Sequence, residues 1–111
     1  MGDVDTELRA AIAAVEGRQG GLTGHSVHLH QLDGVRTEAM VYFDAAGARV
    51  DWVHGKGDCA VTGEGSAILE VLLGTGDADA LERDGHLVLY GDRGLVRALP
   101  EAFAAGSDSR G

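Results

Sequence analysis

Histidines are the residues of this chain with the greatest potential for chemistry. Four of the five lie within residues 25–54, and the run His25-x-x-His28-x-His30 falls in a segment that alternates like a strand. Since residues i and i+2 share a strand face, His28 and His30 could supply half of a metal site, completed by Glu38 opposite His28. The interpretation we favour is a solvated polar face with a cross-strand His–Glu pair, and we expect no tightly bound metal.

Three further polar residues are predicted on the apolar side of the same strands. They are His25, Thr37 and His54, and a polar group on such a face needs a partner. The two histidines could be satisfied side chains at strand ends, anchors for the polar group of a ligand, or a general acid and base. If the protein is an enzyme, the candidate catalytic residues are His25, His54 and Asp51.

Other short motifs indicate little chemistry. Gly63-Glu64-Gly65 follows a strand and opens a helix as a dinucleotide-binding loop does, but the preceding strands are hairpin-linked and Glu64 would repel a pyrophosphate. Gly55-Lys56-Gly57 lacks the spacing and the hydroxyl of a phosphate-binding loop. Cys59 has no flanking base, which favours a buried, inert thiol. We therefore expect no cofactor.

The charge balance excludes several classes of partner. Acidic residues outnumber basic ones 18 to 9, giving a net charge of −9. Nucleic acids and anionic membrane surfaces both need a basic footprint, so neither is an expected partner. No apolar run approaches the length of a membrane span, and the first residues lack the pattern of a signal peptide. A cytoplasmic location is the expectation.

The elements that must position these residues follow from alternation and turn signals. Alternation predicts five strands, over residues 25–31, 35–43, 48–54, 58–62 and 86–90. A three-residue loop, Leu32-Asp33-Gly34, would place Val27 and Leu29 beside Ala39 and Thr37, whereas a two-residue turn would place His28 and His30 there. The apolar match favours the longer loop. The next turn, over residues 44–47, predicts the pairs Phe43–Ala48, Val41–Val50 and Ala39–Trp52.

Helices are predicted over residues 5–16, 66–73, 77–84 and 92–99. Asp5, Asp77 and Asp92 are the expected N-caps, and Gly74 is the expected stop of the second helix. The chain therefore predicts an α+β fold, with a five-stranded, mainly antiparallel sheet and helices packed on one face. We expect one domain over residues 1–103 and a disordered tail over 104–111.

The second half of the chain carries a recognisable series of blocks. These are Asp58-Cys59-Ala60-Val61-Thr62-Gly63, an apolar helix ending Leu72-Leu73-Gly74, the segment Asp77 through Leu81, and Gly85-His86-Leu87-Val88-Leu89-Tyr90-Gly91-Asp92 before a closing amphipathic helix. In these blocks the chain resembles the sterol carrier protein type 2 family, as a small stand-alone member of bacterial type. The resemblance implies a twisted sheet with helices on one side and an apolar tunnel between the layers for lipids.

We therefore expect a binder of an apolar or amphipathic small molecule. The expected ligand-binding residues are Val41, Trp52, His54, Ile68, Leu72 and Leu87. The alternative is a small cyclase, isomerase or dehydratase of secondary metabolism that uses the same cavity. A third interpretation is an assembly module or homodimer, for which an outer apolar patch is predicted from Met40, Tyr42, Val53, Val88 and Tyr90.

Overall fold

A computed structural model describes residues 3–19 and 22–103, which form an α+β domain. In chain order the elements are α1 (Val4–Ala13), β1 (Ser26–Gln31), β2 (Glu38–Asp44), β3 (Gly47–Asp51), β4 (Cys59–Gly63), α2 (Gly65–Leu73), α3 (Ala78–Arg83), β5 (Leu87–Gly91) and α4 (Arg93–Phe103). The expected tail over 104–111 lies outside the described residues. No helix in the described ranges is both long enough and apolar enough to cross a bilayer.

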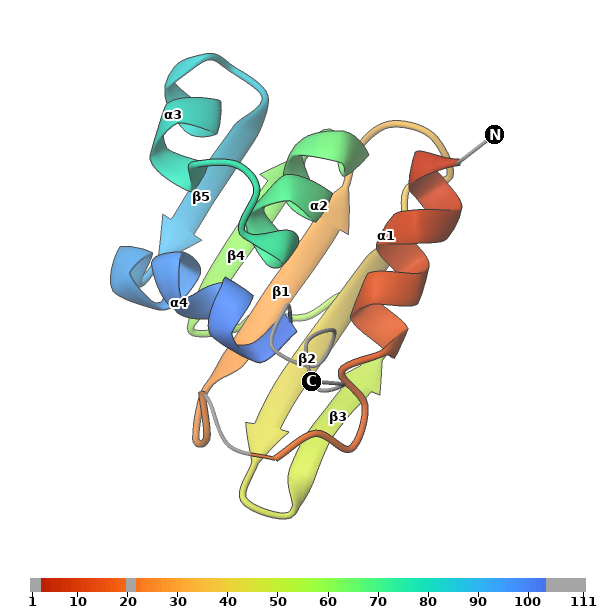
Figure 1. Ribbon diagram of the computed structural model, residues 1–111, viewed down its shortest axis with the longest axis vertical. Helices are drawn as coiled ribbons and strands as arrows, with labels where there is room; N and C mark the ends of the chain where they lie inside the picture. Colours follow the sequence, from red (N-terminus) through yellow and green to blue (C-terminus); the bar gives the residue numbers. More distant parts are fainter. Residues whose placement is uncertain (1–2, 20–21, 104–111) are drawn as a thin grey trace.

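The strands form a single sheet in the order β3-β2-β1-β4-β5 (Figure 1). The pairs β1–β2, β2–β3 and β4–β5 are antiparallel, and β1–β4 is parallel. The prediction of a five-stranded, mainly antiparallel sheet is confirmed. The parallel pair lies at the centre of the sheet and joins a three-stranded meander to a two-stranded unit that carries α2 and α3 in its connection.

The helices cover one face of the sheet, as predicted (Figure 1). The core between the layers is aliphatic, with few large rings. Its fully buried side chains include Leu8 and Ile12 of α1, Ile68 and Leu72 of α2, Leu99 of α4, and Val27, Leu29, Val41 and Val61 of the sheet. We call this the inner face; His28, Glu38, Met40 and Arg49 alternate with the core residues and lie on the opposite, outer face.

Local signals fix most helix ends where the sequence predicts them. The side chain of Asp77 accepts the amide of Asp79, and that of Asp92 accepts the amide of Leu95, so both expected caps are confirmed. Gly74 ends α2 in the left-handed conformation, at φ 76°. The first helix differs, because Asp3 rather than Asp5 is its N-cap. The carboxylate of Asp5 instead accepts a hydrogen bond from the side chain of Gln31.

The connection between β1 and β2 is longer than predicted. Val27 pairs with Val41 and Leu29 with Ala39, two positions further along β2 than the three-residue loop implied. The turn includes Gly34 at φ 56°, and it is drawn toward α2 by a hydrogen bond from the Gly65 amide to Asp33 Oδ1 at 2.9 Å. A shift of two residues preserves the faces, so the predicted side of each strand holds although the predicted partners do not.

The third strand is shorter than predicted. It ends at Asp51, and residues 52–58 leave the sheet edge and cross the outer face to reach β4 on the far side of β1. We call residues 52–58 the crossover. Alternation could not reveal this change of direction, because the alternating pattern continues through His54 and is equally compatible with a strand of seven residues. The predicted pairing of Ala39 with Trp52 is therefore wrong.

Candidate functional site

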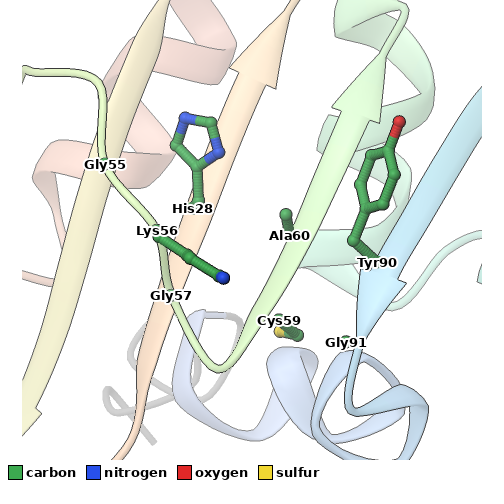
Figure 2. Close-up of a pocket in the computed structure, with 8 residues that line it drawn as sticks. All are labelled: His28, Gly55, Lys56, Gly57, Cys59, Ala60, Tyr90 and Gly91. Carbon is green, nitrogen blue, oxygen red and sulfur yellow. The ribbon is translucent and has the colours of Figure 1, made fainter.

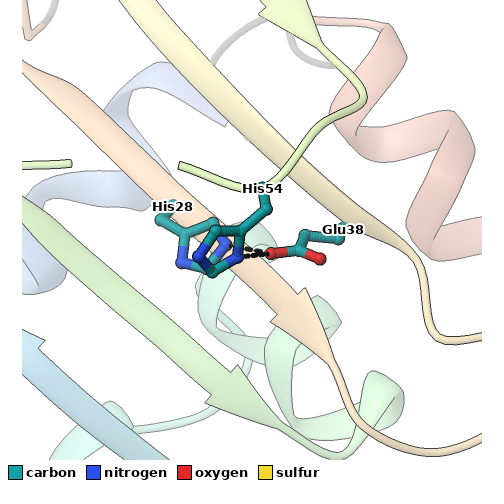
Figure 3. Close-up of side chains that lie close together, drawn as sticks. All are labelled: His28, Glu38 and His54. Carbon is teal, nitrogen blue, oxygen red and sulfur yellow. Dashed lines mark hydrogen bonds and ion pairs between the residues drawn. The ribbon is translucent and has the colours of Figure 1, made fainter. Parts of the chain in front are cut away.

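Three imidazole rings converge on one carboxylate on the outer face. Glu38 Oε2 lies 2.7 Å from His28 Nε2 and 2.5 Å from His54 Nδ1 (Figure 3). Glu38 Oε1 lies 3.7 Å from His30 Nε2. The rings also contact one another, with the His28 and His54 centroids 5.2 Å apart and nearly perpendicular. We call these four residues the outer-face cluster.

Each member reaches the cluster for a local reason. His28 and His30 are two residues apart on β1, so strand alternation places both on the outer face. Glu38 begins β2 directly opposite His30 and lies diagonally across from His28. His54 arrives in the crossover, which passes over the sheet from β3. The sequence predicted the His–Glu pair, but it assigned His54 to the inner face, and this assignment is wrong.

Glycines let the crossover lie directly on the strands. A Cβ at Gly55 would come 2.6 Å from Met40 Cγ, and one at Gly57 would come within 3.0 Å of the backbone of Ser26 and His28. Met40 is consequently 1% exposed although it lies on the outer face. The predicted outer apolar patch is wrong at this residue, while Val53, Val88 and Tyr90 are exposed.

Burial of the cluster shapes its electrostatics. The side chain of His28 is 9% exposed and that of Glu38 22%, whereas that of His54 is 79% exposed. Burial raises the pKa of Glu38, but the hydrogen bonds from His28 and His54 and the nearby charge of His30 outweigh it, so the pKa stays below its ordinary value. The carboxylate is thus held ionised among nitrogen donors. The expectation of a solvated polar face is wrong for His28.

A cavity of about 280 Å³ adjoins the cluster (Figure 2). It lies where the crossover meets β1, β4 and β5, and Lys56 and Tyr90 stand on two of its sides. Its lining comprises His28, Gly55, Lys56, Gly57, Cys59, Ala60, Tyr90 and Gly91. His28 therefore belongs to both the cavity and the outer-face cluster.

Cys59 cannot serve this cavity as a nucleophile in its resting state. The residue is 1% exposed and belongs to the core. Burial, together with the carboxylates of Asp92 and Asp58, raises the pKa of the thiol to about 12. The prediction of a buried thiol is confirmed.

Four of the six expected ligand-binding residues lie in the inner core, and Trp52 and His54 do not. Val41, Ile68, Leu72 and Leu87 are each at most 2% exposed and belong to the inner core. Trp52 follows the end of β3; it is 38% exposed and stacks beneath the guanidinium of Arg9 of α1 at 4.3 Å, so it lies at the edge of the helix layer rather than in the core. A wall built of inner-face residues therefore includes the four aliphatic side chains and excludes Trp52 and His54.

The candidate acid–base residues are not assembled at one centre. His25 pairs with Asp58 at 3.3 Å, Asp51 faces Arg49 at 3.5 Å, and His54 belongs to the outer-face cluster. The side chains of all three are about half exposed or more. His25 was predicted on the apolar face, but its ring is exposed beside the aspartate.

A buried polar network ties the β1–β2 turn to two helices, and the sequence reasoning missed it. Gln31 is 1% exposed; its amide nitrogen donates to Asp5 and Asp33, and its carbonyl oxygen accepts the amide of Thr37. The Gly65 amide is the largest cause that holds the pKa of Asp33 below its ordinary value. Among the described residues, Thr37 Oγ1 is buried and has no hydrogen-bond partner. The only signal in the sequence was a polar residue at an inward-facing strand position.

Two smaller pockets border the helix layer. One, of about 220 Å³, lies at the end of the sheet where Leu87 and Val88 approach the β1–β2 turn. The other, of about 170 Å³, lies between α4 and the segment that joins α2 to α3, and it includes the core side chains Val71 and Val96. The second pocket thus reaches the core from outside.

Comparison with known proteins gives a consistent architecture. No family model and no curated protein matches the chain. Among solved structures, the chain is similar to a UbiJ-SCP2 ubiquinone synthesis protein, with 21% identity, a TM-score of 0.56, and coverage of 92% of this chain and 78% of that one. The chain has a sterol carrier protein-like fold.

Two further sterol carrier protein structures show the same architecture. Sterol carrier protein 2 from Yarrowia lipolytica, in its apo form, is 15% identical with a TM-score of 0.53, and the match covers 90% of this chain and 76% of that one. The palmitated SCP2L2 from Aedes aegypti is 19% identical with a TM-score of 0.50 and 90% coverage of both chains. The resemblance seen in the sequence blocks is therefore confirmed at the level of the fold.

Proposed function

We propose that this protein binds an apolar or amphipathic small molecule between the sheet and its covering helices. The observation that carries the proposal is the sterol carrier protein-like arrangement of an aliphatic inner face under α2 and α4. One similar structure is described as palmitated and another as a ubiquinone synthesis protein, so an acyl or isoprenoid chain is the ligand class to test first.

The composition of the two layers supports the proposal, because small side chains replace large rings at several core positions. Small side chains, Ala39, Ala48 and Ala67, lie among the aliphatic residues of both layers. Burial of an acyl chain contributes about 0.8 kcal/mol per methylene, so a long chain can support binding near ~1 µM after the costs of association.

The region around α3 offers a way in. This helix has six residues, of which only Ala78 is buried. Ion pairs of Arg93 with Glu82 and of Arg97 with Asp79 hold it at the surface. Elements with few buried contacts open at low free energy, and the pocket at Val71 and Val96 lies beside this one. We infer that α3 and the start of α4 part to admit the ligand.

A pair of neighbouring leucines provides the test. Leu72 is fully buried on the core side of α2, whereas its neighbour Leu73 on the same helix is 42% exposed. In a displacement assay with a fluorescent fatty acid, Leu72→Phe should weaken binding at least tenfold because it occupies the inter-layer space. Leu73→Phe, the matched control, should bind as the unchanged protein does. Thermal melting of both variants verifies that they fold.

Outcomes that contradict the proposal are equally clear. Absence of displacement and of any rise in melting temperature with palmitate, a polyprenyl quinone and a sterol would exclude the binder. Equal weakening by both leucine variants would place the ligand outside the inner face. Trp52 is a poor reporter here, because it lies at the surface beside Arg9.

The enzymatic alternative and the homodimer stay predictions from the sequence, as does the cytoplasmic location. For the enzymatic alternative, the three candidate acid–base residues have separate partners, so no single arrangement of them favours a cyclase or isomerase.

A further inference from the structure

We propose that the outer-face cluster binds a divalent transition-metal cation of the zinc class, through His28, Glu38 and His54. One ligand atom from each of these residues lies within 4.8 Å of the other two. This site is separate from the inner face on which the proposed function rests. It also replaces the expectation of no metal that the sequence favoured.

Crowding around Glu38 distinguishes this cluster from an ordinary ion pair. Elsewhere each carboxylate faces one imidazole, as Glu64 faces His86 and Asp58 faces His25. Here two rings share the same oxygen, and a third ring stands 3.7 Å from the other oxygen. Two ring nitrogens turned toward one carboxylate oxygen form a donor set that a dication can bind, once the N–H protons between them have moved to the other ring nitrogen or to solvent.

The distances permit coordination after a small adjustment. Tetrahedral ligands about 2.0–2.2 Å from zinc stand roughly 3.4 Å from one another. The present separations of 2.7 Å and 2.5 Å from Glu38 Oε2 are those of hydrogen bonds, so each must open by less than about 1 Å. His54 has the freedom to do so, because its side chain is 79% exposed and its segment carries glycine at Gly55 and Gly57.

The rest of the site is held in place. His28 and Glu38 lie on adjacent strands with side chains only 9% and 22% exposed, so these two ligands are oriented without metal. His30 Nε2 or water can supply a fourth ligand. Imidazole and carboxylate together select zinc, cobalt, nickel or copper over calcium and magnesium, which prefer oxygen alone.

The site adjoins the 280 Å³ cavity through His28. A cation bound there would stand at the wall of a space that Lys56 and Tyr90 also line. The exposed ring of His54 gives the ion a route from solvent. Metal exchange should therefore not require unfolding.

The experiment uses Zn²⁺ for affinity and Co²⁺ for geometry, on chelator-treated protein. Calorimetric titration should show one Zn²⁺ per chain with micromolar or tighter affinity, and Zn²⁺ should raise the melting temperature. Co²⁺ should give the intense visible absorption bands of a tetrahedral site. His54→Ala should weaken Zn²⁺ binding at least tenfold and abolish the Co²⁺ bands, and Glu38→Gln should do the same.

A histidine outside the cluster serves as the control. His86 is a partly exposed ring paired with a glutamate, so His86→Ala removes a comparable His–Glu contact elsewhere. It should leave Zn²⁺ affinity and the Co²⁺ spectrum unchanged. Absence of stoichiometric binding, or equal losses in His54→Ala and His86→Ala, would overturn the proposal. Because His54 is exposed, its variant tests the site even if Glu38→Gln fails to fold.

Discussion

The two faces of the sheet carry different types of side chain and are covered by different segments of the chain. The inner face is aliphatic and lies under three helices and the short α3, and its polar exceptions are confined to the Gln31 network. The outer face carries histidines, a glutamate and an arginine, and its cover is a glycine-containing segment rather than a helix. The two proposals thus assign an apolar ligand to one face and an ion to the other, on the same strands.

This difference shows how alternation assigns two chemistries to one set of strands. Each residue step along β1 passes from the core to the outer-face cluster, as Val27, His28 and Leu29 do. Burial alone does not separate the faces, because His28 and Met40 are nearly as inaccessible as the core. The residue types on each face, and the segments that cover them, therefore distinguish the two faces better than the exposed fraction of their side chains does.

The largest expected contrast concerns the inner-face thiol. With a pKa of about 12, against 9.0 for a free thiol, Cys59 should carry roughly a thousandth of the usual thiolate at pH 8. A disulfide reagent should therefore modify the native protein about a thousandfold more slowly than the denatured chain. Spectrophotometric thiol titration with and without denaturant measures both rates. Rapid modification of the native protein would show that the inner layer opens readily at β4.

Truncating one side chain on each face comes next. Leu72→Ala, in the fully buried core, should lower the free energy of unfolding by about 2–5 kcal/mol. Tyr90→Ala, at a residue 58% exposed on the outer face, should change it by less than about 1 kcal/mol. Denaturant unfolding of the two variants gives the comparison. Similar costs would mean that the outer face is packed as tightly as the core.

A substitution in the crossover tests how closely it lies on the outer face. A Cβ at Gly57 would meet backbone atoms of Ser26, His28 and Cys59 at 2.9–3.0 Å, so Gly57→Ala should cost about 1–3 kcal/mol. The displaced segment should also carry His54 away from Glu38. Imidazole NMR signals report that movement, and the unfolding free energy reports the cost. Unchanged signals and stability would show that the crossover stands away from the strands.

The smallest expected effect is the pH response of an isolated histidine pair. The hydrogen bond and charge of Glu64 raise the pKa of His86 above its ordinary value. Because the pKa is raised on folding, the pair stabilises the fold fully below the unfolded pKa of about 6.5, and this contribution is lost as pH rises through the folded pKa. NMR titration should show the His86 pKa falling in Glu64→Gln. No change in that variant would remove the pair as the cause.

The sequence predicted the inner face far better than the outer one. Strand and helix periodicity placed Val27, Val41, Ile68 and Leu72 in the core, because burial on one side of an element repeats at a fixed interval. A two-residue error in the β1–β2 register did not matter to that assignment. The outer-face cluster required the path of the crossover, which has no period and depends on where β4 joins the sheet.

Two of the predicted ligand-binding residues lie outside the core for the same reason. Trp52 and His54 extend the alternation of β3, so they were assigned to its inner side, but the chain leaves the edge after Asp51. Glycine at positions 55 and 57 was the available signal, since it permits close backbone approach to a packed surface. The Gln31 network was also beyond the pattern, because its partners come from α1, the β1–β2 turn and the start of α2.

The central parallel pair has a consequence for how the chain assembles. Strands β1 to β3 pair with chain neighbours through short connections, whereas the pairs of Val27 with Cys59 and of Cys59 with Gly91 each join residues 32 positions apart. Long-range pairing is slow because the entropy of closing the loop is lost before the contacts between the strands form. Docking of the β1–β3 meander on the β4–β5 unit should therefore limit the folding rate. The crossover is the segment of chain that connects the β1–β3 meander to β4. A polypeptide cleaved there should behave as two complementary fragments that recombine along β1 and β4.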